Sequence, residues 1–542
     1  MAEGHSPSFA SYMHSIPLSV ALVLASLSVA RAGPPVAPPS NPLIPAKFEA
    51  SIQLENLLGH SKKIWEFANL PGAKTTRSFG TIGYNATADY FAKLAEDHGY
   101  HVERQTVRYP ATTIISNSLK INGVDVPLSE ITTFQYSGSA SLTAPLVLVP
   151  NLGCSAADYE GLNAAGKIVL VHRGVCTFVE KGEIAKAAQV AGIIMRNNVA
   201  GPPVASRLEP TAFETNPPTL SLSQAAAEPI VTRLTAGESI TATLNINVSN
   251  EFRHSDNIIA TSKTGDQNKV LVVGAHLDSV PAGAGVNDDG SGSATIAELA
   301  IQLSKFGGLK NAVRFAWWTT EEVGLVGSHY YVDHLSASEK SKIFANLNLD
   351  MTASPNYIIG LNLLPMVHVG QNSLTIKRRI GVYDADNSTG QNTGTPAPPG
   401  STAIKKLFQL HYDKRGINHT NYAFTSGSDY RPFLDAGIPS GGVATGAGGI
   451  KTPFEVSLFG GTAGIQYDPC YHLLCDDLSN LATDAYLWNA RANADVIAQL
   501  LTTDSAVILR DPVSFVRLKS GVRQFEYAAN LGEECHSHHD EL

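Results

Sequence analysis

The sequence predicts an α/β fold, a three-layer sandwich around a central, mostly parallel sheet. After Glu251, strand-like and helix-like segments alternate, which is the pattern of a parallel sheet covered by helices. Residues 119–250 differ, with short β-branched runs between polar turns, and predict a small β-rich module inserted into the larger domain. Chemically reactive residues also follow three of the predicted strands, as they do in open α/β sheets.

The individual elements follow from periodicity. Apolar residues recur at i+3/i+4 spacing from Leu54 to Phe67, which predicts a helix. Further helices are expected at 86–99, 179–191, 291–306, 325–335, 403–416 and 481–501. Strands are expected at 102–109, 144–149, 167–171, 192–195, 270–273, 313–318 and 343–349.

The bulk composition excludes several classes of protein. A chain of 542 residues with 43% hydrophobic and 16% charged residues is globular and has room for two or three domains. The net charge of −9 argues against nucleic acid as a partner. Beyond the N-terminal segment, no stretch approaches the roughly 20 apolar residues of a membrane span. We therefore expect a soluble mature protein without a membrane partner, as a monomer.

Both ends of the chain carry sorting signals. Residues 16–25 form an apolar core too short to span a membrane, and Ala30-Arg31-Ala32 fits a signal-peptide cleavage site. Met13 is an alternative start. The C-terminal residues His539-Asp540-Glu541-Leu542 spell an endoplasmic-reticulum retrieval signal. We expect entry into the secretory pathway, with secretion as the main destination and retention in the endoplasmic reticulum as the alternative.

Cysteines and glycosylation triplets agree with that pathway. Cys154 and Cys176 form one local pair, Cys470 and Cys475 form another, and Cys535 stands alone. In an oxidising compartment the local pairs are expected to close as disulfides, while metal binding by Cys470 and Cys475 is the weaker alternative. The triplets that predict N-glycosylation begin at Asn85, Asn247, Asn387 and Asn418.

Changes in texture along the chain suggest its division. The expected parts are a signal peptide (1–32), a linker or pro-segment (33–47), a first part of the larger domain (48–118), the insert (119–250), a second part with the reactive residues (251–510) and a tail (511–542).

Six scattered residues suggest a metal centre. His276 follows an apolar run, Asp350 follows another, and the pair Glu321-Glu322 comes after a third. Each of these residues alone has an ordinary structural explanation, such as a cap or a turn. Together, with Asp288 in a glycine-rich turn and His472 further on, they supply two imidazoles, three carboxylates and a spare glutamate. This set predicts a two-zinc hydrolase.

The motifs around these residues resemble a known family. They are His276-x-Asp278, residues 285–292 (GVNDDGSG), 321–328 (EEVGLVGS), 348–351 (NLDM) and 467–472 (YDPCYH). In this order they resemble the co-catalytic zinc aminopeptidases of the aminopeptidase Y and fungal leucine aminopeptidase type, over nearly the whole mature chain. Arg173-Gly174-x-Cys176-x-Phe178 resembles the protease-associated domain inserted in such enzymes. The resemblance implies the zinc exopeptidase fold and peptide N-termini as substrates, with leucine and other apolar residues preferred.

The resemblance also implies a role for each residue. His276 and Asp350 would hold the first of two Zn²⁺ ions, Glu322 and His472 would hold the second, and Asp288 would bridge them. Glu321 would be the general base for a metal-bridged water. The remaining implied roles belong to Asp278, which would orient His276, and Tyr471, which would stabilise the oxyanion.

The resemblance also implies a structural role for each disulfide. Cys154–Cys176 would staple the insert, and Cys470–Cys475 would brace the loop that presents His472.

Where the family commonly has arginine this chain has Gly427, and a new arginine stands at Arg431. Either Arg431 takes over, or the substrate preference differs.

Three other functions share this scaffold. A carboxypeptidase or dipeptidase would use the same ligands but usually carries a dimerisation region, for which little room remains after Leu501. A glutaminyl cyclase would need a single zinc, and a non-catalytic relative would be expected to lack a ligand or the base. The complete set favours an aminopeptidase, with the carboxypeptidase or dipeptidase as the alternative.

Overall fold

The computed structural model describes residues 39, 41–357 and 381–509, which belong to one compact unit. The predicted signal peptide, residues 33–38 and 40 of the predicted linker, and the tail with its retrieval signal lie outside the described residues. Residues 45–47, assigned to the linker from sequence, instead begin helix α1 (Pro45–Ser51). Proline is favoured in the first turn of a helix, where its missing N–H costs nothing.

The central sheet is mostly parallel, as predicted. In the order β13-β12-β14-β11-β9-β10-β8, neighbours β9 and β10, β9 and β11, and β11 and β14 run parallel. The pairs β10–β8 and β12–β14 are antiparallel. These strands are β8 (Ile240–Thr261), β9 (Asp266–His276), β10 (Asn311–Trp318), β11 (Ile343–Leu349), β12 (Gly381–Tyr383), β13 (Thr420–Tyr422) and β14 (Ser440–Ala444).

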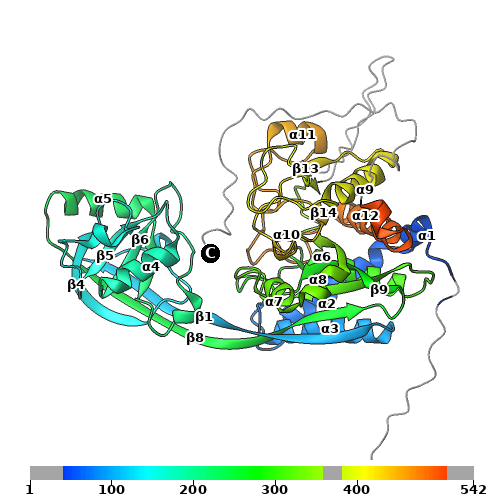
Figure 1. The fold of residues 1–542 in the computed structure, drawn as a ribbon. Helices are drawn as coiled ribbons and strands as arrows, with labels where there is room; N and C mark the ends of the chain where they lie inside the picture. The colour runs from blue at the N-terminus through cyan, green and yellow to red at the C-terminus, as the bar shows by residue number, and fades with distance from the viewer. Residues whose placement is uncertain (1–38, 40, 358–380, 510–542) are drawn as a thin grey trace, which may run out of the picture. The chain divides into compact units, whose positions relative to one another are not determined.

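Helices cover both faces of this sheet (Figure 1). Neighbouring side chains of a strand point to opposite faces, and two tryptophans on β10 show this. Trp317 stacks on Phe91, while Trp318 packs against Tyr331 and Phe433. The Trp317 face is covered by α1, α2 (Leu54–Ala68), α3 (Ile82–Asp97), α6 (Gly290–Leu303), α9 (Ser401–Lys414) and α12 (Thr483–Thr502). The Trp318 face is covered by α7 (Val326–His334) and α10 (Arg431–Asp435).

The inserted block has an apolar core of its own. It contains the parallel run β4 (Ala140–Leu148), β5 (Ile168–His172), β6 (Gly192–Arg196) and β7 (Thr219–Leu222), with β2 (Val124–Asp125) and β3 (Ile131–Thr133). Its helices are α4 (Phe178–Ala187) and α5 (Gln224–Thr235). Helix α5 was not predicted, and it carries in its interior Pro229, a residue that disfavours helices.

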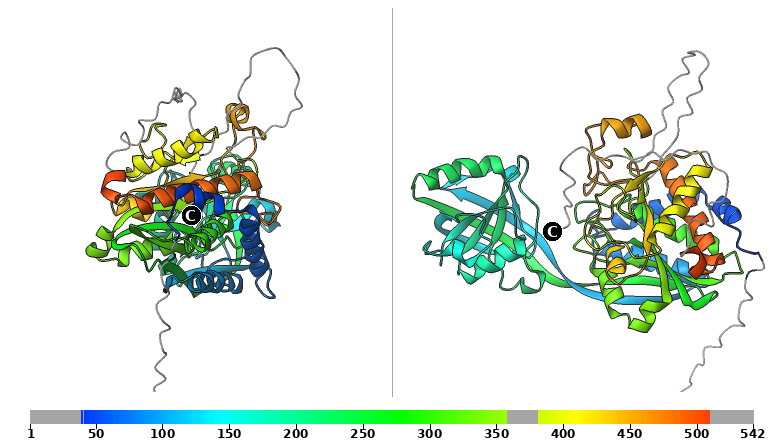
Figure 2. Two further views of the ribbon diagram at one scale, coloured as in Figure 1. Left: turned by 90° about the vertical axis from the view of Figure 1, so that its right-hand side faces the viewer. Right: turned by 45° about the horizontal axis from the view of Figure 1, so that its top comes forward.

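Two long strands run from the larger domain into the insert. β1 (His101–Ile121) pairs antiparallel with β8 from His101–Thr261 to Ile121–Ala242, and the pair is seen as a continuous ribbon in Figure 2. The predicted boundaries at 118/119 and 250/251 fall inside these strands, so the division into parts stays a prediction. The strand expected at 102–109 is longer because β8 supplies backbone partners along its whole length.

Most other elements match within a few residues, and the differences lie at ends. Helix α3 begins at Ile82, before the predicted 86, because the Thr81 side chain caps it by accepting the Tyr84 N–H. Helix α4 ends at Ala187 instead of 191. The remaining helices are α8 (Ala337–Lys342), α11 (Pro453–Phe459) and α13 (Ser505–Ile508), with single 3₁₀ turns at Leu128–Glu130, Ala156–Tyr159 and Pro210–Ala212.

The expected covalent features can be placed on this fold. Disulfides join Cys154 to Cys176 and Cys470 to Cys475. Of the glycosylation triplets, Asn85, Asn247 and Asn387 are exposed, whereas Asn418 is only 8% exposed. Glycosylation at all four stays a prediction. Within the described ranges, no helix combines the length and the apolar character needed to cross a membrane.

Candidate metal centre

The reactive residues converge at one edge of the central sheet. β9 ends at His276, whose parallel partner Trp318 ends β10 shortly before Glu321. On the other side of β9, β11 ends at Leu349 and is followed by Asp350. Parallel strands deliver their carboxyl ends to the same edge, so the three predicted strand-end segments meet there, as sequence reasoning expected.

One trio of possible ligands gathers around His276. Its Nε2 lies 3.2 Å from Asp288 Oδ1 and 3.7 Å from Asp350 Oδ1. Glu321 Oε2 lies 3.9 Å from the same nitrogen. The trio itself consists of His276, Asp288 and Asp350, whose ligand atoms all lie within 4.8 Å of one another.

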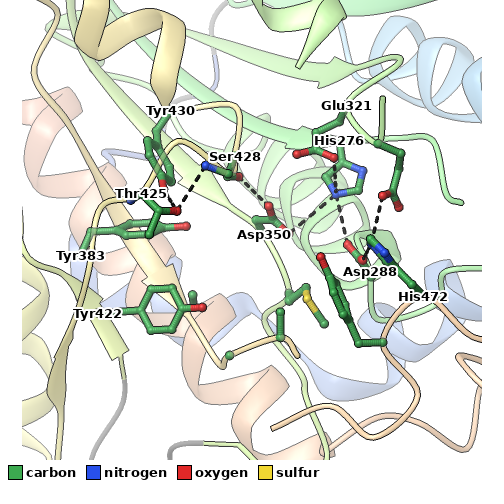
Figure 3. Close-up of a pocket in the computed structure, with 17 residues that line it drawn as sticks. His276, Asp288, Glu321, Asp350, Tyr383, Tyr422, Thr425, Ser428, Tyr430 and His472 are labelled. Atoms are coloured by element: carbon green, nitrogen blue, oxygen red, sulfur yellow. Dashed lines mark hydrogen bonds and ion pairs between the residues drawn. The ribbon is translucent and has the colours of Figure 1, made fainter. Parts of the chain in front are cut away.

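A second trio gathers around His472 and shares one member with the first (Figure 3). His472 Nε2 lies 3.2 Å from Asp288 Oδ2 and 3.1 Å from Glu322 Oε2. Asp288 therefore turns one oxygen toward each histidine. Sequence reasoning placed Asp288 between two metals, and the structure gives its carboxylate a position from which it can reach both trios.

The chemistry of these groups fits a metal ion. In the described part of the chain, the ion pairs of these carboxylates are with His276 and His472 and involve no lysine or arginine. Glu322 Oε1 is buried without a hydrogen-bond partner. Buried carboxylates normally need a cation or hydrogen-bond donors. Imidazole nitrogen with carboxylate oxygen is a donor set that suits zinc.

Asp278 acts on the backbone of the glutamate pair. Its carboxylate accepts the N–H of Glu321 at 3.0 Å and that of Glu322 at 3.3 Å. His276 Nδ1 is 3.1 Å from the main-chain carbonyl of Asp278 but 4.0 Å from its carboxylate. The carboxyl group was expected to orient His276; here the carbonyl contacts the imidazole, and the carboxylate holds the loop of the two glutamates.

Two further buried carboxylates, missed from sequence, hold other ligand segments. Asp289 accepts the N–H of His276 at 3.2 Å and that of Met351, next to Asp350, at 3.0 Å. Asp476 accepts the N–H of Asn287 at 2.8 Å and that of Asp288 at 3.0 Å. Their closeness in sequence to Asp288 and to His472 is the only signal that could have pointed to them. The backbones of the ligand-bearing segments are thus tied to one another by carboxylates.

The protein without metal places its histidines in a strongly negative field. Burial opposes the charged form of His472, but Glu322 and Asp288 outweigh it and raise its pKa to about 10. Burial also opposes a charged His276, yet Glu321 and neighbouring carboxylates raise its pKa well above the usual value. Burial raises the pKa of Glu321. A cation bound here would relieve the same negative field that now favours the protons.

Several backbone positions near the centre are conformationally costly. Thr320, Met351 and His472 have φ values of 60°, 54° and 59°. Side chains other than glycine rarely adopt this region, and such residues cluster at functional sites. Thr320 precedes Glu321 and Met351 follows Asp350, so each strained residue is a candidate ligand or base, or adjoins one.

Tyr471 and His472 share a small loop. The Cys470–Cys475 disulfide closes this loop, and the two rings stack with centroids 3.8 Å apart. Burial raises the pKa of Tyr471 well above its usual value, so its hydroxyl stays protonated and can donate a hydrogen bond. The structure places this hydroxyl-bearing ring in the wall of the cavity that contains both trios.

That cavity extends from the trios toward the far edge of the sheet. Apart from the trios, Glu321 and Tyr471, it is lined by Met351, Tyr383, Tyr422, Thr425, Gly427, Ser428, Tyr430, Ala444, Gly446 and Ala447. The three tyrosines and Met351 were not foreseen from sequence. Ser428 donates to Asp350 Oδ2 at 2.5 Å and accepts from Asn348 at 2.7 Å, which fixes Asp350 from behind.

Gly427 stands where the family commonly has arginine, and it adds no side chain to the wall of the cavity. Gly427 lines the cavity, whereas Arg431 is not among the described lining residues. The Arg431 guanidinium binds Asp435 and Ser426 instead. The structure therefore gives no support to the idea that Arg431 takes over at the cavity. The neighbouring Asp429 is buried, and burial raises its pKa to about 7.

Comparisons with known proteins agree with this architecture. The family model "Peptidase family M28" matches residues 257–497, and the PA domain model matches 142–230. The chain is 38% identical to leucine aminopeptidase 2 of Trichophyton rubrum, covering 90% of this chain and 92% of that protein. It is 36% identical to a probable leucine aminopeptidase 2 of Aspergillus oryzae, over 87% and 89% of the two chains. An aminopeptidase from Aneurinibacillus sp. strain AM-1 has a similar fold, with a TM-score of 0.66, 24% identity, and coverage of 85% and 97%.

Proposed function

This chain belongs to peptidase family M28, and we propose that it is a zinc aminopeptidase that removes leucine and other apolar residues from peptide N-termini. Membership confirms the family and the class of enzyme, a metallo-aminopeptidase, that the motifs predicted. The observation that carries the proposal is the pair of ligand trios that share Asp288, with Glu321 beside them.

Two zinc ions would be held by the two trios. His276, Asp350 and one oxygen of Asp288 would bind the first, while His472, Glu322 and the other oxygen would bind the second. When bound, zinc would lower the pKa of a coordinated water and polarise the scissile carbonyl. The fold contributes rigid placement, because backbone hydrogen bonds to Asp278, Asp289 and Asp476 hold the ligand segments.

Glu321 would serve as the general base. Its carboxylate lies beside the first trio and is 3% exposed. Burial raises its pKa, which makes the carboxylate a better proton acceptor than a solvated glutamate and a proton donor to the leaving amine in a later step. The two hydrogen bonds from the backbone of the glutamate pair to Asp278 keep it in place. Tyr471 would donate its hydroxyl hydrogen to the developing oxyanion.

The walls of the cavity favour an amino terminus over a carboxyl terminus. Its described lining includes several carboxylates but no lysine or arginine. Apart from the two metal ions, a free carboxylate finds no cation in this lining, whereas a free ammonium group can pair with the carboxylates there. Tyr383, Tyr422 and Met351 offer apolar surface for the N-terminal side chain. This favours aminopeptidase action over the carboxypeptidase alternative.

The test compares leucine-p-nitroanilide with its N-acetylated form. We expect wild type with zinc to cleave only the free-amine substrate. Glu321→Gln should lower kcat by about 10²–10⁴-fold while zinc content and KM stay close to wild type, because the substitution removes the base and no ligand. Glu298→Gln is the matched control, since Glu298 is also buried at 1% exposure but lies outside the centre, and it should keep wild-type kcat.

Two outcomes would contradict the proposal. If zinc-loaded wild type leaves the free-amine substrate intact while it shortens peptides from their carboxyl end, the carboxypeptidase alternative is right. If Glu321→Gln keeps wild-type kcat, another group is the base.

A further inference from the structure

We infer that Arg77 is a positioning residue: its buried guanidinium fixes the loop between His276 and Asp288 and thereby sets the affinity of the centre for metal. This rests on the proposed function in one respect, the binding of zinc at the two trios. Arg77 lies in the segment between α2 and α3, and it contacts no candidate ligand side chain in its described hydrogen bonds.

The guanidinium of Arg77 binds both ends of that loop. The side chain is fully buried. Its Nε donates to the Ala284 carbonyl at 2.8 Å and its Nη2 to the Gly285 carbonyl at 2.5 Å. Its Nη1 donates to the carbonyl of Leu277. Leu277 follows His276 directly, and Gly285 stands three residues before Asp288, so one rigid group spans the start and the end of the loop.

The backbone around Arg77 holds the same loop. The Arg77 N–H donates to Ser279 Oγ at 3.0 Å, and Ser279 Oγ donates to the Gly283 carbonyl at 2.9 Å. Thr76 Oγ1 donates to the Val280 carbonyl at 2.9 Å. The loop is thus closed around the guanidinium from several sides. It has few ways to change the distance between His276 and Asp288.

Gly285 shows how tightly the loop closes. Its φ is +61°, and a Cβ there would lie 2.3 Å from the Asp288 carbonyl oxygen and 3.1 Å from Arg77 Nη2. Only glycine fits a backbone that approaches both groups so closely. The position of the guanidinium and the path of the chain into Asp288 therefore depend on each other.

Charge supports the same role. Asp278, Asp289 and Asp476, which hold the backbones of the ligand segments, all interact favourably with the charged form of Arg77. Burial lowers the pKa of Arg77 and these carboxylates oppose that effect. Arginine pKa values are so high that the group remains a cation. Arg77 is therefore a fixed positive charge behind the carboxylates that organise the ligands.

A lysine cannot reproduce this arrangement. The planar fork of arginine directs its donors to three separate carbonyls at once, whereas an ammonium group is a single point. A lysine at position 77 would keep the charge but lose part of the geometry, and a methionine would lose both. The two variants separate the contribution of charge from that of loop geometry.

The test measures zinc affinity on metal-free protein, by competition with a chromophoric chelator. We expect Arg77→Met to weaken zinc binding at least about tenfold, as loss of a group supporting metal ligands does, and Arg77→Lys to weaken it by less. The visible spectrum of the cobalt-substituted protein should change in both, because ligand geometry changes. Lys181→Met is the matched control: this fully buried cation also donates to carbonyls, those of Leu152 and Gly174, within the insert. It should lower Tm and leave zinc affinity unchanged.

The outcomes are distinguishable. Folded Arg77→Met with wild-type zinc affinity and an unchanged cobalt spectrum would overturn the inference while leaving the proposed function intact. If Arg77→Met does not fold, Arg77→Lys and Ser279→Ala carry the test, and unchanged affinity in both would overturn it. If wild type binds no zinc, both the proposed function and this inference are wrong.

Discussion

Two clusters of histidine and carboxylate in this molecule have similar composition and different surroundings. Besides the metal centre, Glu49, His411 and Asp495 bring ligand atoms within 4.8 Å of one another. They come from α1, α9 and α12, on the Trp317 face of the sheet. His411 Nδ1 lies 2.8 Å from Asp495 Oδ2, which is shorter than the 3.1 Å between His472 and Glu322 in the centre.

The difference lies in the cations nearby. Arg415 binds Glu49 through two nitrogens, with Nε 2.8 Å from Oε1. In the centre, Asp288, Glu322 and Asp350 have only the histidines as ion-pair partners among the described residues. Residue types within reach of one another do not make a metal site. A metal site is much better indicated by carboxylates that no arginine or lysine neutralises.

The largest effect should come from Asp288→Asn, set against Asp495→Asn in the second cluster. Both replace a carboxylate that contacts histidine. We expect Asp288→Asn to lose zinc from both trios and to lower kcat by about 10³-fold or more, because it removes the shared ligand. Asp495→Asn should change neither zinc content nor kcat and should lower only Tm. Equal zinc loss in the two variants, measured by elemental analysis, would remove the distinction between the clusters.

A smaller effect should appear in the pH dependence of stability without metal. In the folded metal-free protein the pKa of His472 is raised to about 10 by Glu322 and Asp288, against burial. In the unfolded chain the pKa of this histidine is about 6.5. The stabilisation that the charged His472 gives the folded protein is therefore complete below that pH and is lost as pH rises through 10. The raised pKa of Glu321 acts in the same direction. We expect the Tm of metal-free protein to fall from pH 6.5 to 10.

The zinc-loaded protein provides the control for that measurement. Zinc needs neutral imidazoles, so its stabilising effect should grow as pH rises, and the gap in Tm between loaded and metal-free protein should widen. The second cluster is present in both forms and cancels in the difference. A Tm of metal-free protein that stays level or rises over this range would contradict the assigned electrostatics.

The smallest effect should follow from Arg415→Met, which makes the second cluster resemble the first. Without the guanidinium, Glu49 lacks its arginine partner, and the cluster offers three ligand atoms that no arginine binds. We expect one additional zinc ion to bind weakly, detected by isothermal titration calorimetry as a site about 10²-fold or more weaker than the centre, because no backbone network orders it. Unchanged stoichiometry would mean that the cluster geometry, and not the arginine, prevents binding.

Part of the centre could be predicted from sequence because several of its residues directly follow strands that the sequence makes recognisable. His276, Glu321 and Asp350 each follow an apolar strand closely, and parallel strands deliver their ends to one edge. The central sheet followed from the same alternation of strands and helices. The roles of His276, Glu321 and Asp350 as ligands or base stay proposals that the experiments above can test.

What sequence reasoning missed depends on contacts between distant segments. Arg77 is 200 positions from the carbonyl of Leu277 that it binds, and Asp476 is 189 positions from Asn287. No periodicity links such pairs. Tyr383 and Tyr422 belong to strands of three residues each, too short to give a pattern. The full length of β1 was missed because its pairing with β8 depends on residues more than a hundred positions away.

The order of the ligands along the chain has a consequence for synthesis. Ribosomes deliver the N-terminal residues first. His276, Asp288 and Asp350 have all emerged before β14, which pairs with β11 beside them, has been made. His472 arrives last, together with Tyr471 in the loop closed by Cys470 and Cys475. A nascent chain therefore has the complete first trio but lacks one ligand of the second until His472 has been made. A product truncated before His472 would lack that ligand.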